Sequence, residues 1–189
     1  GFGKSVTMGL FDTNLEPALY EKGGLSVIFD KDGSNEISIL ARNGYYVRIR
    51  RGMDSGQAPL KALEDIEEDR NWLAGFIVSL IMDDGGLEPP PDQLEKLRTG
   101  IAFIMRRQPA MRTIAGLRMF LDHGKDSTGG RLEKWCRGGS LGWVFDGEED
   151  RIRTTAGVVG IGNTEILPDD MSHVRQPSAA YQFYRVRKK

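Results

Sequence analysis

The hydrophobic positions in the first quarter of the chain alternate between helical and strand-like spacing. Apolar residues from Val6 to Leu19 recur on one side of a helix, which the pair Gly23 and Gly24 would end. Residues 25–29 form a short apolar run that is typical of a buried strand. A second helix is predicted over 35–42 and a second strand over 45–49. This order of elements predicts an α/β sheet.

From about residue 60 the pattern becomes continuously helical. Apolar residues between Trp72 and Ile81 recur at helical spacing, and later helices are predicted over 93–107, 114–121 and 131–136. So long a run of helices exceeds an ordinary crossover between two parallel strands. We therefore expect a helical insertion over residues 60–137.

Strand character returns in the last quarter of the chain. Residues 141–146 and 158–161 are predicted strands, and residues 179–185 a helix that leads into a basic end. The predicted organisation is thus an α/β core formed by residues 1–59 and 138–189, interrupted by the helical insertion.

Composition narrows the classes of function only slightly. With 189 residues and a net charge of −1, the chain can bury one sizeable core but offers no general electrostatic attraction to nucleic acid. The single cysteine, Cys136, excludes an internal disulfide and a zinc site built from several cysteines. His123 and His173 are too far apart in sequence to suggest a metal site.

The first five residues, Gly1-Phe2-Gly3-Lys4-Ser5, match the second half of the phosphate-binding pattern G-x-x-x-x-G-K-[S/T]. Glycines let backbone N–H groups approach phosphate oxygens, the lysine reaches the β- and γ-phosphates, and the hydroxyl ligates Mg²⁺. The alternative interpretation of so short a match is a glycine turn that leads into a helix.

A phosphate loop needs a carboxylate at the end of a neighbouring strand, to hold the water around Mg²⁺ and polarise the attacking water. Asp30 and Asp32 follow the strand that comes directly after the loop helix, which makes them the better candidates. Asp146 follows the run 141–145 but leads into an acidic turn. The alternative for each is a structural role in capping a turn.

Several further short segments follow the phosphate-binding pattern in a fixed order: Phe29-Asp30-Lys31-Asp32, Gly44-Tyr45-Tyr46, the stretch from Ser55 to Leu60, Leu132-Glu133-Lys134-Trp135, the stretch from Gly142 to Asp146, and the stretch from Ala180 to Val186. In order and spacing they resemble the type IV secretion and conjugal-transfer ATPases of the CagE/TrbE/VirB family, within the RecA-like group of hexameric motors. The resemblance covers nearly the whole chain and includes that family's F-D-K-D-R-G, T-G-x-N-P-type and Y-L-F-H-R-I segments.

The chain departs from the family pattern at three places. Gly33 and Ser34 stand where the family has Arg-Gly, and Ala58 stands where it usually has asparagine. Gly162 occupies the aspartate position of a G-F-D-x-T segment. These departures indicate a divergent member whose active site is weakened.

The resemblance implies an α/β fold with a RecA-like P-loop NTPase core, present as a fragment with an all-helical insertion. Its parent would bind ATP and Mg²⁺ and hydrolyse ATP to energise secretion. The resemblance assigns nucleotide binding to Gly1, Phe2, Gly3, Lys4, Ser5 and Val6, with Ser5 on the metal, and catalysis to Lys4 together with Asp30 or Asp32.

The resemblance also implies a homo-hexamer, partners among other secretion-system components, and a place in the bacterial cytoplasm at the cytoplasmic face of the inner membrane. Direct nucleic-acid binding stays open. The family's strand ending in Asp-Glu would follow Lys189 and its first strand would precede Gly1. We therefore expect a fragment without ATPase activity of its own.

Two alternative functions stay open from the sequence. A DNA translocase of the FtsK/HerA group shares the phosphate loop and the hexamer, but its channel favours basic pore loops, and no clear one is visible here. A non-catalytic assembly module is the other alternative, since a divergent fragment would bind nucleotide poorly.

Overall fold

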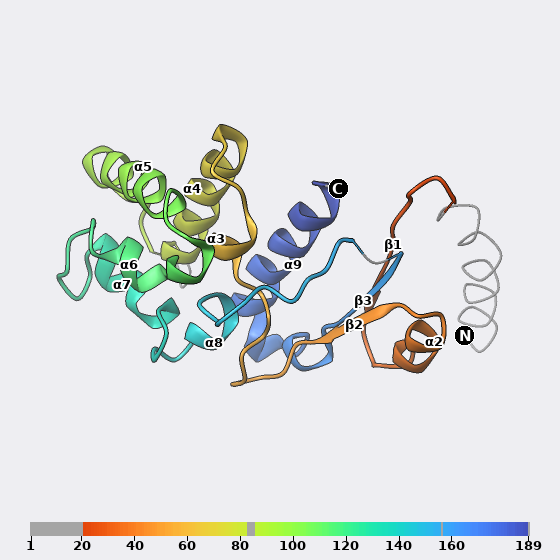
Figure 1. The fold of residues 1–189 in the computed structure, drawn as a ribbon. Helices are drawn as coiled ribbons and strands as arrows, with labels where there is room; N and C mark the ends of the chain where they lie inside the picture. Colours follow the sequence, from red (N-terminus) through yellow and green to blue (C-terminus); the bar gives the residue numbers. More distant parts are fainter. Residues whose placement is uncertain (1–20, 83–85, 156, 189) are drawn as a thin grey trace.

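A small parallel sheet and a layer of helices form the two ends of the molecule, and the last helix, α9 (Ser172–Arg187), lies between them (Figure 1). The structure is a computed structural model that describes residues 21–82, 86–155 and 157–188. The predicted helix that begins at Val6 lies largely outside the described residues.

The described part of the sheet has three strands in the order β1-β3-β2, all parallel. They are β1 (Ser26–Asp30), β2 (Tyr45–Arg48) and β3 (Val158–Gly162), so the strands predicted over 25–29, 45–49 and 158–161 are confirmed. The middle strand β3 is buried throughout, as expected for a parallel strand covered on both faces. Helix α2 (Glu36–Ala41) joins β1 to β2 where a helix was predicted over 35–42.

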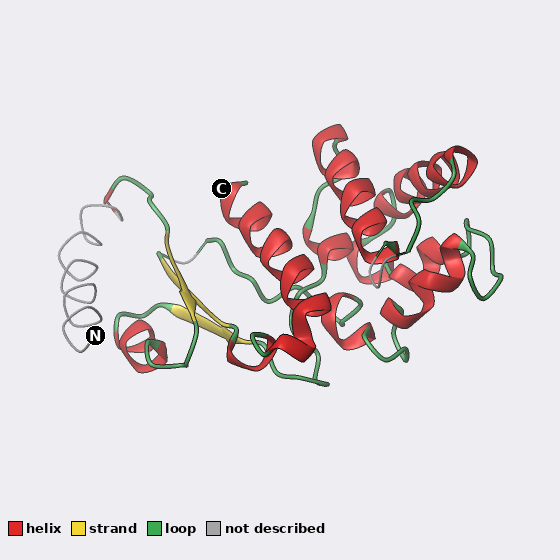
Figure 2. Cartoon of the chain, turned by 180° about the vertical axis from the view of Figure 1, so that it is seen from behind, coloured by secondary structure: helices red, strands yellow, loops and turns green. Residues whose placement is uncertain are grey.

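The chain between β2 and β3 forms the helical layer, which Figure 2 shows beside the sheet from the opposite side. Its α-helices are α3 (Pro59–Ala62), α4 (Glu67–Ile81), α5 (Pro91–Met105), α6 (Ile114–Arg118), α7 (Thr128–Leu132) and α8 (Gly142–Phe145). Short 3₁₀ turns also occur: η2 (Pro109–Met111), η3 (Glu133–Trp135), η4 (Thr164–Ile166) and η5 (Asp169–Met171). Between β2 and β3, helices are the only regular elements in the part of the chain that the structure describes, and they continue past residue 137 to α8. The division into a core and a helical insertion over residues 60–137 stays a prediction.

The core of the helical layer follows the periodicity read from the sequence. On α4 the buried apolar residues are Leu73, Phe76, Ile77, Leu80 and Ile81, the spacing of one helical face. This face packs against α5 and α7, and the buried indole N–H of Trp135 donates to the Leu80 carbonyl at 3.1 Å. The apolar side of α4 therefore organises the layer around a fully buried tryptophan.

The strand predicted over 141–146 is wrong, because these residues form the short helix α8. Val144 and Phe145 are buried, so a fully apolar run gave no periodicity by which to distinguish helix from strand. Gly142 lies so close to the chain at Cys136 that a Cβ would come within 2.2 Å of that carbonyl oxygen. Asp146 does not end a strand; its carboxylate accepts the backbone N–H groups of Ile114 and Arg137 at 2.8 Å each.

Two predicted helices have different limits in the structure. The helix predicted over 131–136 is α7 followed by η3, and the last helix begins at Ser172 rather than at Ala179. Pro177 lies inside α9, where it removes one backbone hydrogen bond. Because α9 is buried along much of its length, packing outweighs the local cost of the proline.

An aromatic stack and a buried carboxylate join α4 to α9. The Trp72 ring stacks on Tyr184 with a centroid distance of 4.2 Å. Beside it, the buried Asp69 carboxylate accepts hydrogen bonds from the Tyr184 hydroxyl and the Lys188 ammonium at 2.6 Å each, and from the Glu64 backbone N–H at 2.8 Å. Burial raises the pKa of Asp69, but these hydrogen bonds outweigh it and hold the pKa below the ordinary value.

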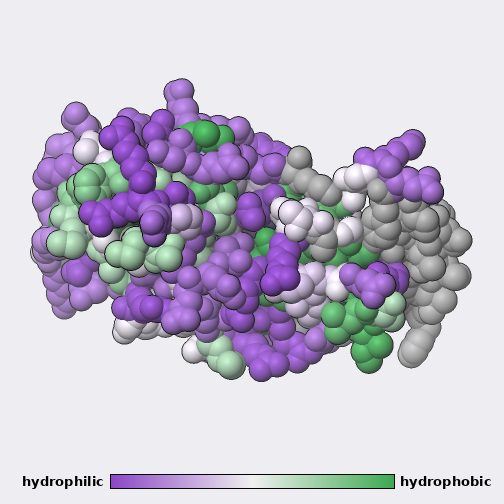
Figure 3. Space-filling model, in the orientation of Figure 1, coloured by the Kyte–Doolittle hydropathy of each residue, from purple (hydrophilic) through white to green (hydrophobic). Residues whose placement is uncertain are grey.

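The surface seen in Figure 3 is mostly polar, with apolar side chains gathered over α2. Ile37 and Leu40 contribute to this patch and are 82% and 51% exposed. In the described ranges, every helix is too short or too polar to cross a membrane.

The contacts of Asp69 predict how it stabilises the protein. In Asp69→Asn, the side chain no longer carries the negative charge that faces the Lys188 ammonium. Its NH₂ group is a donor, although the groups around it are donors as well. We expect the free energy of unfolding to fall by about 1–3 kcal/mol at neutral pH. Because the folded-state pKa is lowered, this stabilisation is fully present above the ordinary aspartate pKa of 3.8 and is lost as the pH falls through the folded-state pKa.

Urea unfolding of wild type and Asp69→Asn, from neutral pH to about pH 3, measures this difference. The exposed Asp126→Asn serves as the control carboxylate. A stability difference that stays constant down to the lowest pH would exclude the charge as its cause.

Candidate functional site

The residues predicted to bind nucleotide, Gly1 to Val6, lie outside the described residues, so the structure gives no geometry for Lys4 or Ser5. The described part of the predicted site is the carboxyl edge of the parallel sheet. There the strand ends Asp30, Gly162 and Arg48 lie side by side in register. Ligands of open α/β sheets bind at this edge, outside the carboxyl ends of the strands.

The Asp30 carboxylate is buried and is held by four hydrogen bonds. It accepts the backbone N–H of Gly33 at 3.2 Å, the backbone N–H and side-chain amide of Asn35 at 3.0 and 3.3 Å, and the Tyr46 hydroxyl at 2.9 Å. Gly33 has a φ of +78°, which a residue without Cβ adopts readily and which closes this turn. Asp30 therefore fixes the turn between β1 and α2 and links it to β2.

Two glycines on β3 allow Tyr46 to reach Asp30. A Cβ at Gly160 would come within 2.4 Å of the Tyr46 ring, and one at Gly162 within 2.5 Å of its hydroxyl. Burial is the largest effect that raises the pKa of Tyr46, followed by the hydrogen bond to Asp30. Glycine at position 162 is thus required by the way Tyr46 crosses the sheet, which gives a physical reason for this departure from the family pattern.

Asp32 differs from Asp30 because its side chain is exposed. It accepts the Ser34 backbone N–H at 3.1 Å, and hydrogen bonding to Ser34 is the main cause that lowers its pKa. The structure therefore brings Asp30 and Asp32 to the same edge of the sheet, one of them enclosed by donors and the other facing solvent.

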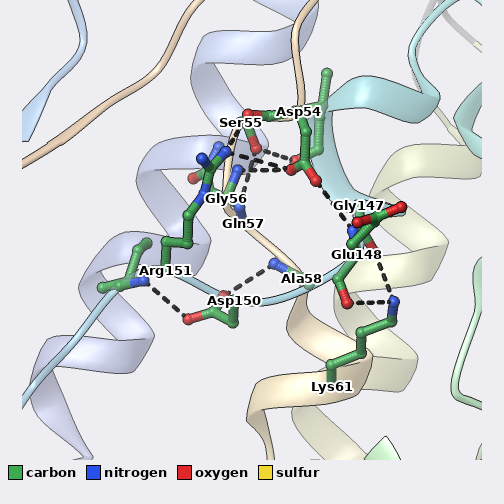
Figure 4. Close-up of polar contacts among 12 residues, drawn as sticks. Asp54, Ser55, Gly56, Gln57, Ala58, Lys61, Gly147, Glu148, Asp150 and Arg151 are labelled. Carbon is green, nitrogen blue, oxygen red and sulfur yellow. Dashed lines mark hydrogen bonds and ion pairs between the residues drawn. The ribbon is translucent and has the colours of Figure 1, made fainter. Parts of the chain in front are cut away.

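A loop at residues 54–58, the 54–58 loop, is buried from Ser55 to Ala58 and makes many hydrogen bonds (Figure 4). The Ser55 hydroxyl donates to the Val144 carbonyl at 2.5 Å and accepts the Gln57 N–H at 3.0 Å. Asp54 accepts the backbone N–H groups of Gly56 and Glu148 at 2.9 and 3.0 Å. Gly56, with a φ of +73°, lets the chain turn beneath the Arg151 side chain.

Asp150 fixes the end of this loop. Its carboxylate accepts hydrogen bonds from the Ala58 N–H at 2.9 Å and from the Tyr181 hydroxyl. The Nε atom of Arg185 lies 3.8 Å from its Oδ1 atom. Burial raises the pKa of Asp150, against the lowering effects of Ala58, Tyr181 and Arg185. Lys61 completes the contact by donating to the carbonyls of Gly147 and Glu148 at 2.6 and 2.8 Å, as seen in Figure 4.

A chain of buried amides connects the carboxyl edge of the sheet to the 54–58 loop. Asn163, the residue after β3, exchanges two hydrogen bonds with Gln182 at 3.0 and 2.9 Å. Gln182 donates to Gln57 at 3.2 Å, and Gln57 donates to the Ser178 hydroxyl at 3.2 Å. The sheet edge, α9 and the loop thus share one polar network in the interior.

A polar hollow of about 520 Å³ lies beside the 54–58 loop. Its charged residues are Arg51, Asp54, Arg137 and Asp146. Arg51 pairs with Asp170 and Arg137 with Glu148, while both carboxylates of the hollow accept backbone N–H groups. Charges in this hollow are therefore balanced within the chain.

The sequence indicated the segments that meet here but not their contacts. The stretches from Ser55 to Leu60 and from Ala180 to Val186 were both singled out, and the structure places them together through Gln57 and Gln182. Sequence reasoning missed Asp54, Asp69 and Asp150. Their signal was weak, because Asp69 and Asp150 lie in charged runs, which are typical of solvated surface positions.

The chain is similar in sequence to several VirB4 proteins. The chain is 39% identical over 187 residues to protein VirB4 of Rhizobium radiobacter and 38% identical to that of Agrobacterium fabrum. It is 28% identical to the type IV secretion system protein VirB4 of Bartonella quintana. Each alignment covers 98% of the chain and 23% of the relative, so the chain spans about a quarter of the length of these proteins. No family model matches the chain.

A solved structure supports the fold independently. VirB4 of Thermoanaerobacter pseudethanolicus matches all of the chain and 56% of its own, with a TM-score of 0.67 at 13% sequence identity. The likeness shows that the mixed α/β arrangement, with its small parallel sheet and many helices, is that of part of a VirB4 protein. The chain therefore belongs to the VirB4 family of type IV secretion system proteins, of which it represents one segment.

Proposed function

We propose that the chain is the front part of the ATP-hydrolysing domain of a type IV secretion motor. The observation that carries this proposal is the match to VirB4 proteins over 98% of the chain. The chain's own Gly3-Lys4-Ser5 supports it, since these residue types are the ones that hold a nucleotide triphosphate. The same match favours a secretion motor over a DNA translocase of the FtsK/HerA group.

The proposed nucleotide site uses the residues from Gly1 to Val6. Backbone N–H groups of Gly1, Gly3 and Lys4 would cradle the phosphates, and the Ser5 hydroxyl is a hard oxygen ligand of the kind that suits Mg²⁺. ATP and Mg²⁺, when bound, supply the phosphoryl group and the metal charge. Lys4 would neutralise negative charge that develops at the γ-phosphate during in-line attack by water.

The two aspartates at the sheet edge fit different roles in this proposal. Asp30 has its acceptor positions occupied by four protein donors, which supports a positioning role for the turn after β1. Asp32 is exposed and carries a lowered pKa, so it is ionised at neutral pH and free to order water. We therefore assign the water-ordering role to Asp32.

Assembly and location form a further part of the proposal. We infer a homo-hexamer that works with other secretion-system components at the cytoplasmic face of the inner membrane. The VirB4 relatives carry the type IV secretion system in their names, which supports partners of that kind.

Lys4→Ala in the intact protein tests the phosphate loop directly. We expect ATP turnover, measured as phosphate release, to fall at least about 100-fold, because the γ-phosphate loses its neutralising cation. The melting temperature should stay within about 2 °C of wild type, and the exposed Lys125→Ala is the matched control. Turnover that survives Lys4→Ala would show that the loop is misassigned, whereas absence of turnover in wild type would favour a non-catalytic assembly module.

The isolated 189-residue chain is predicted to be inactive. It contains no Asp-Glu dipeptide, so the carboxylate pair expected of the second nucleotide motif is missing from it. Phosphate release by the purified chain should equal that of its Lys4→Ala variant. A difference between the two would contradict the requirement for a second acidic motif.

The variants Asp30→Asn and Asp32→Asn distinguish a structural role from a catalytic role for the two aspartates at the sheet edge. We expect Asp30→Asn to lower the free energy of unfolding by about 2–4 kcal/mol, because an amide cannot accept from all four donors. Asp32→Asn should leave stability unchanged and lower kcat of the intact protein about 10-fold or more, with Asp126→Asn as the exposed control. Equal loss of stability in both variants would refute the division of roles.

A further inference from the structure

The longest stretch of the chain without an acidic residue covers residues 96–121, which form the greater part of α5 together with η2 and α6. It contains six basic residues, although the whole chain carries 26 basic and 27 acidic ones. These six are Lys96, Arg98, Arg106, Arg107, Arg112 and Arg118. The stretch therefore concentrates positive charge on one part of the helical layer, and Figure 1 shows α5 at the end of the molecule away from the sheet.

Three of these basic side chains have partners within the chain. Lys96 pairs with Asp122 at 3.2 Å, and Arg118 pairs with Glu133 at 2.9 Å. The buried Arg112 guanidinium donates to three backbone carbonyls. The packing of the helical layer alone accounts for these three residues.

The other three, Arg98, Arg106 and Arg107, are exposed, and none of them forms an ion pair with a residue that the structure describes. Arg98 and Arg106 are eight residues apart, so their Cα atoms are separated by about 12 Å along α5 and its end. A basic residue in the last turn of a helix also compensates the helix dipole, which accounts for Arg106 and Arg107 but not for Arg98.

A half-exposed aromatic ring lies among these arginines. Phe103 is 46% exposed and precedes Arg106 and Arg107 by three and four positions, so all three side chains lie on the same side of the helix. The Arg107 guanidinium carbon lies 4.8 Å from the centroid of the Phe103 ring, and the Phe120 ring centroid is 5.4 Å from it. We call Arg98, Phe103, Arg106 and Arg107 the arginine face of α5.

The composition of the arginine face favours a protein partner over a nucleic acid. Arginine and phenylalanine are enriched at protein–protein interfaces and lysine is depleted there, and the arginine face contains no lysine. A nucleic acid would need an open aromatic ring for base stacking, but Arg107 already covers one face of Phe103. It would also need more contacts to phosphates than three arginines supply.

We propose that the arginine face of α5 binds an acidic segment of a separate protein. Carboxylates of that segment accept hydrogen bonds from Arg98 and Arg106, and an apolar side chain of the segment packs on Phe103 and on the stem of Arg107. Unpaired positive charge around a half-exposed ring is complementary to a segment that carries both kinds of side chain. The inference concerns the helical layer and does not depend on a nucleotide at the sheet edge.

A fluorescein-labelled peptide with the sequence Glu-Glu-Leu-Phe-Glu-Glu, repeated once, is the probe for this surface on the intact protein. Fluorescence anisotropy should give a Kd below about 1 mM, and at least about 5-fold lower than that of the same peptide with glutamine in place of glutamate. The variant Arg98→Ala/Arg106→Ala should bind the glutamate peptide at least about 5-fold more weakly than wild type, and Phe103→Ala at least about 3-fold more weakly. Absence of binding, equal binding of the glutamine peptide, or unchanged binding by the arginine variant would each overturn the proposal.

A matched variant and a second probe control for charge in general. Lys22→Ala/Lys125→Ala removes two exposed positive charges elsewhere, and its Kd for the glutamate peptide should stay within about 2-fold of wild type. A labelled oligothymidine of the same length tests the other class of partner. If it binds more tightly than the peptide, and Arg98→Ala/Arg106→Ala weakens that binding, the arginine face is a nucleic-acid site and the proposal is wrong.

Melting temperatures distinguish a separate partner from the intact protein's own chain. The chain spans about a quarter of its VirB4 relatives, so the rest of the polypeptide is the competing occupant of this surface. Without any partner present, intact Arg98→Ala/Arg106→Ala should melt within about 2 °C of wild type, because an exposed arginine without an ion pair contributes little to stability. A larger decrease would show that carboxylates of the same polypeptide already occupy the arginine face, and it would overturn the proposal.

Discussion

The structure depends on the burial of α9 between the parallel sheet and the helical layer. Four consecutive residues of this helix contact four different parts of the chain. Tyr181 donates to Asp150 near the 54–58 loop, Gln182 joins the amide network, Phe183 contacts β1, and Tyr184 stacks on α4. Because four residues complete about one full turn, the helix contacts other parts of the chain around its circumference, although Phe183 is 61% exposed.

Several of the buried polar groups of the molecule are held by contacts with α9. Asp69, Asp150 and Gln57 all lie in the interior and all bond to side chains of this helix. A buried polar group without a partner is costly, so each of these contacts specifies where α9 sits as well as stabilising it. These contacts thereby fix the position of the sheet edge relative to the helical layer. A nucleotide site at that edge would require such a fixed position.

Much of the fold was predictable because its elements have clear periodicity. The three strands and α4 follow apolar patterns that one buried face imposes, and the structure confirms them. The failure at residues 141–146 has a physical cause: a short apolar run has no period that distinguishes a helix from a strand, and these residues form the short helix α8 packed closely beside Cys136. The predicted start of the last helix, Ala179, lies after Pro177, whereas α9 begins at Ser172 and continues through this proline because tertiary packing outweighs its local preference.

The sequence indicated which carboxylates follow β1 but not the contacts that they make. The sequence placed Asp30 and Asp32 at one strand end, yet only the structure shows that Asn35 and Tyr46 enclose the first of them. Such contacts depend on the register of β1, β3 and β2, which long-range packing sets. Asp69 and Asp150 could not be identified in advance, since their partners lie 119 and 92 positions away in sequence.

The central claim is that this segment supplies the nucleotide-binding edge of a parallel sheet. The most direct measurement is a structure of the intact protein with Mg²⁺ and a non-hydrolysable ATP analogue. We expect the phosphates on Gly3, Lys4 and Ser5, at the sheet edge that carries Asp30. Nucleotide bound away from that edge would contradict the account.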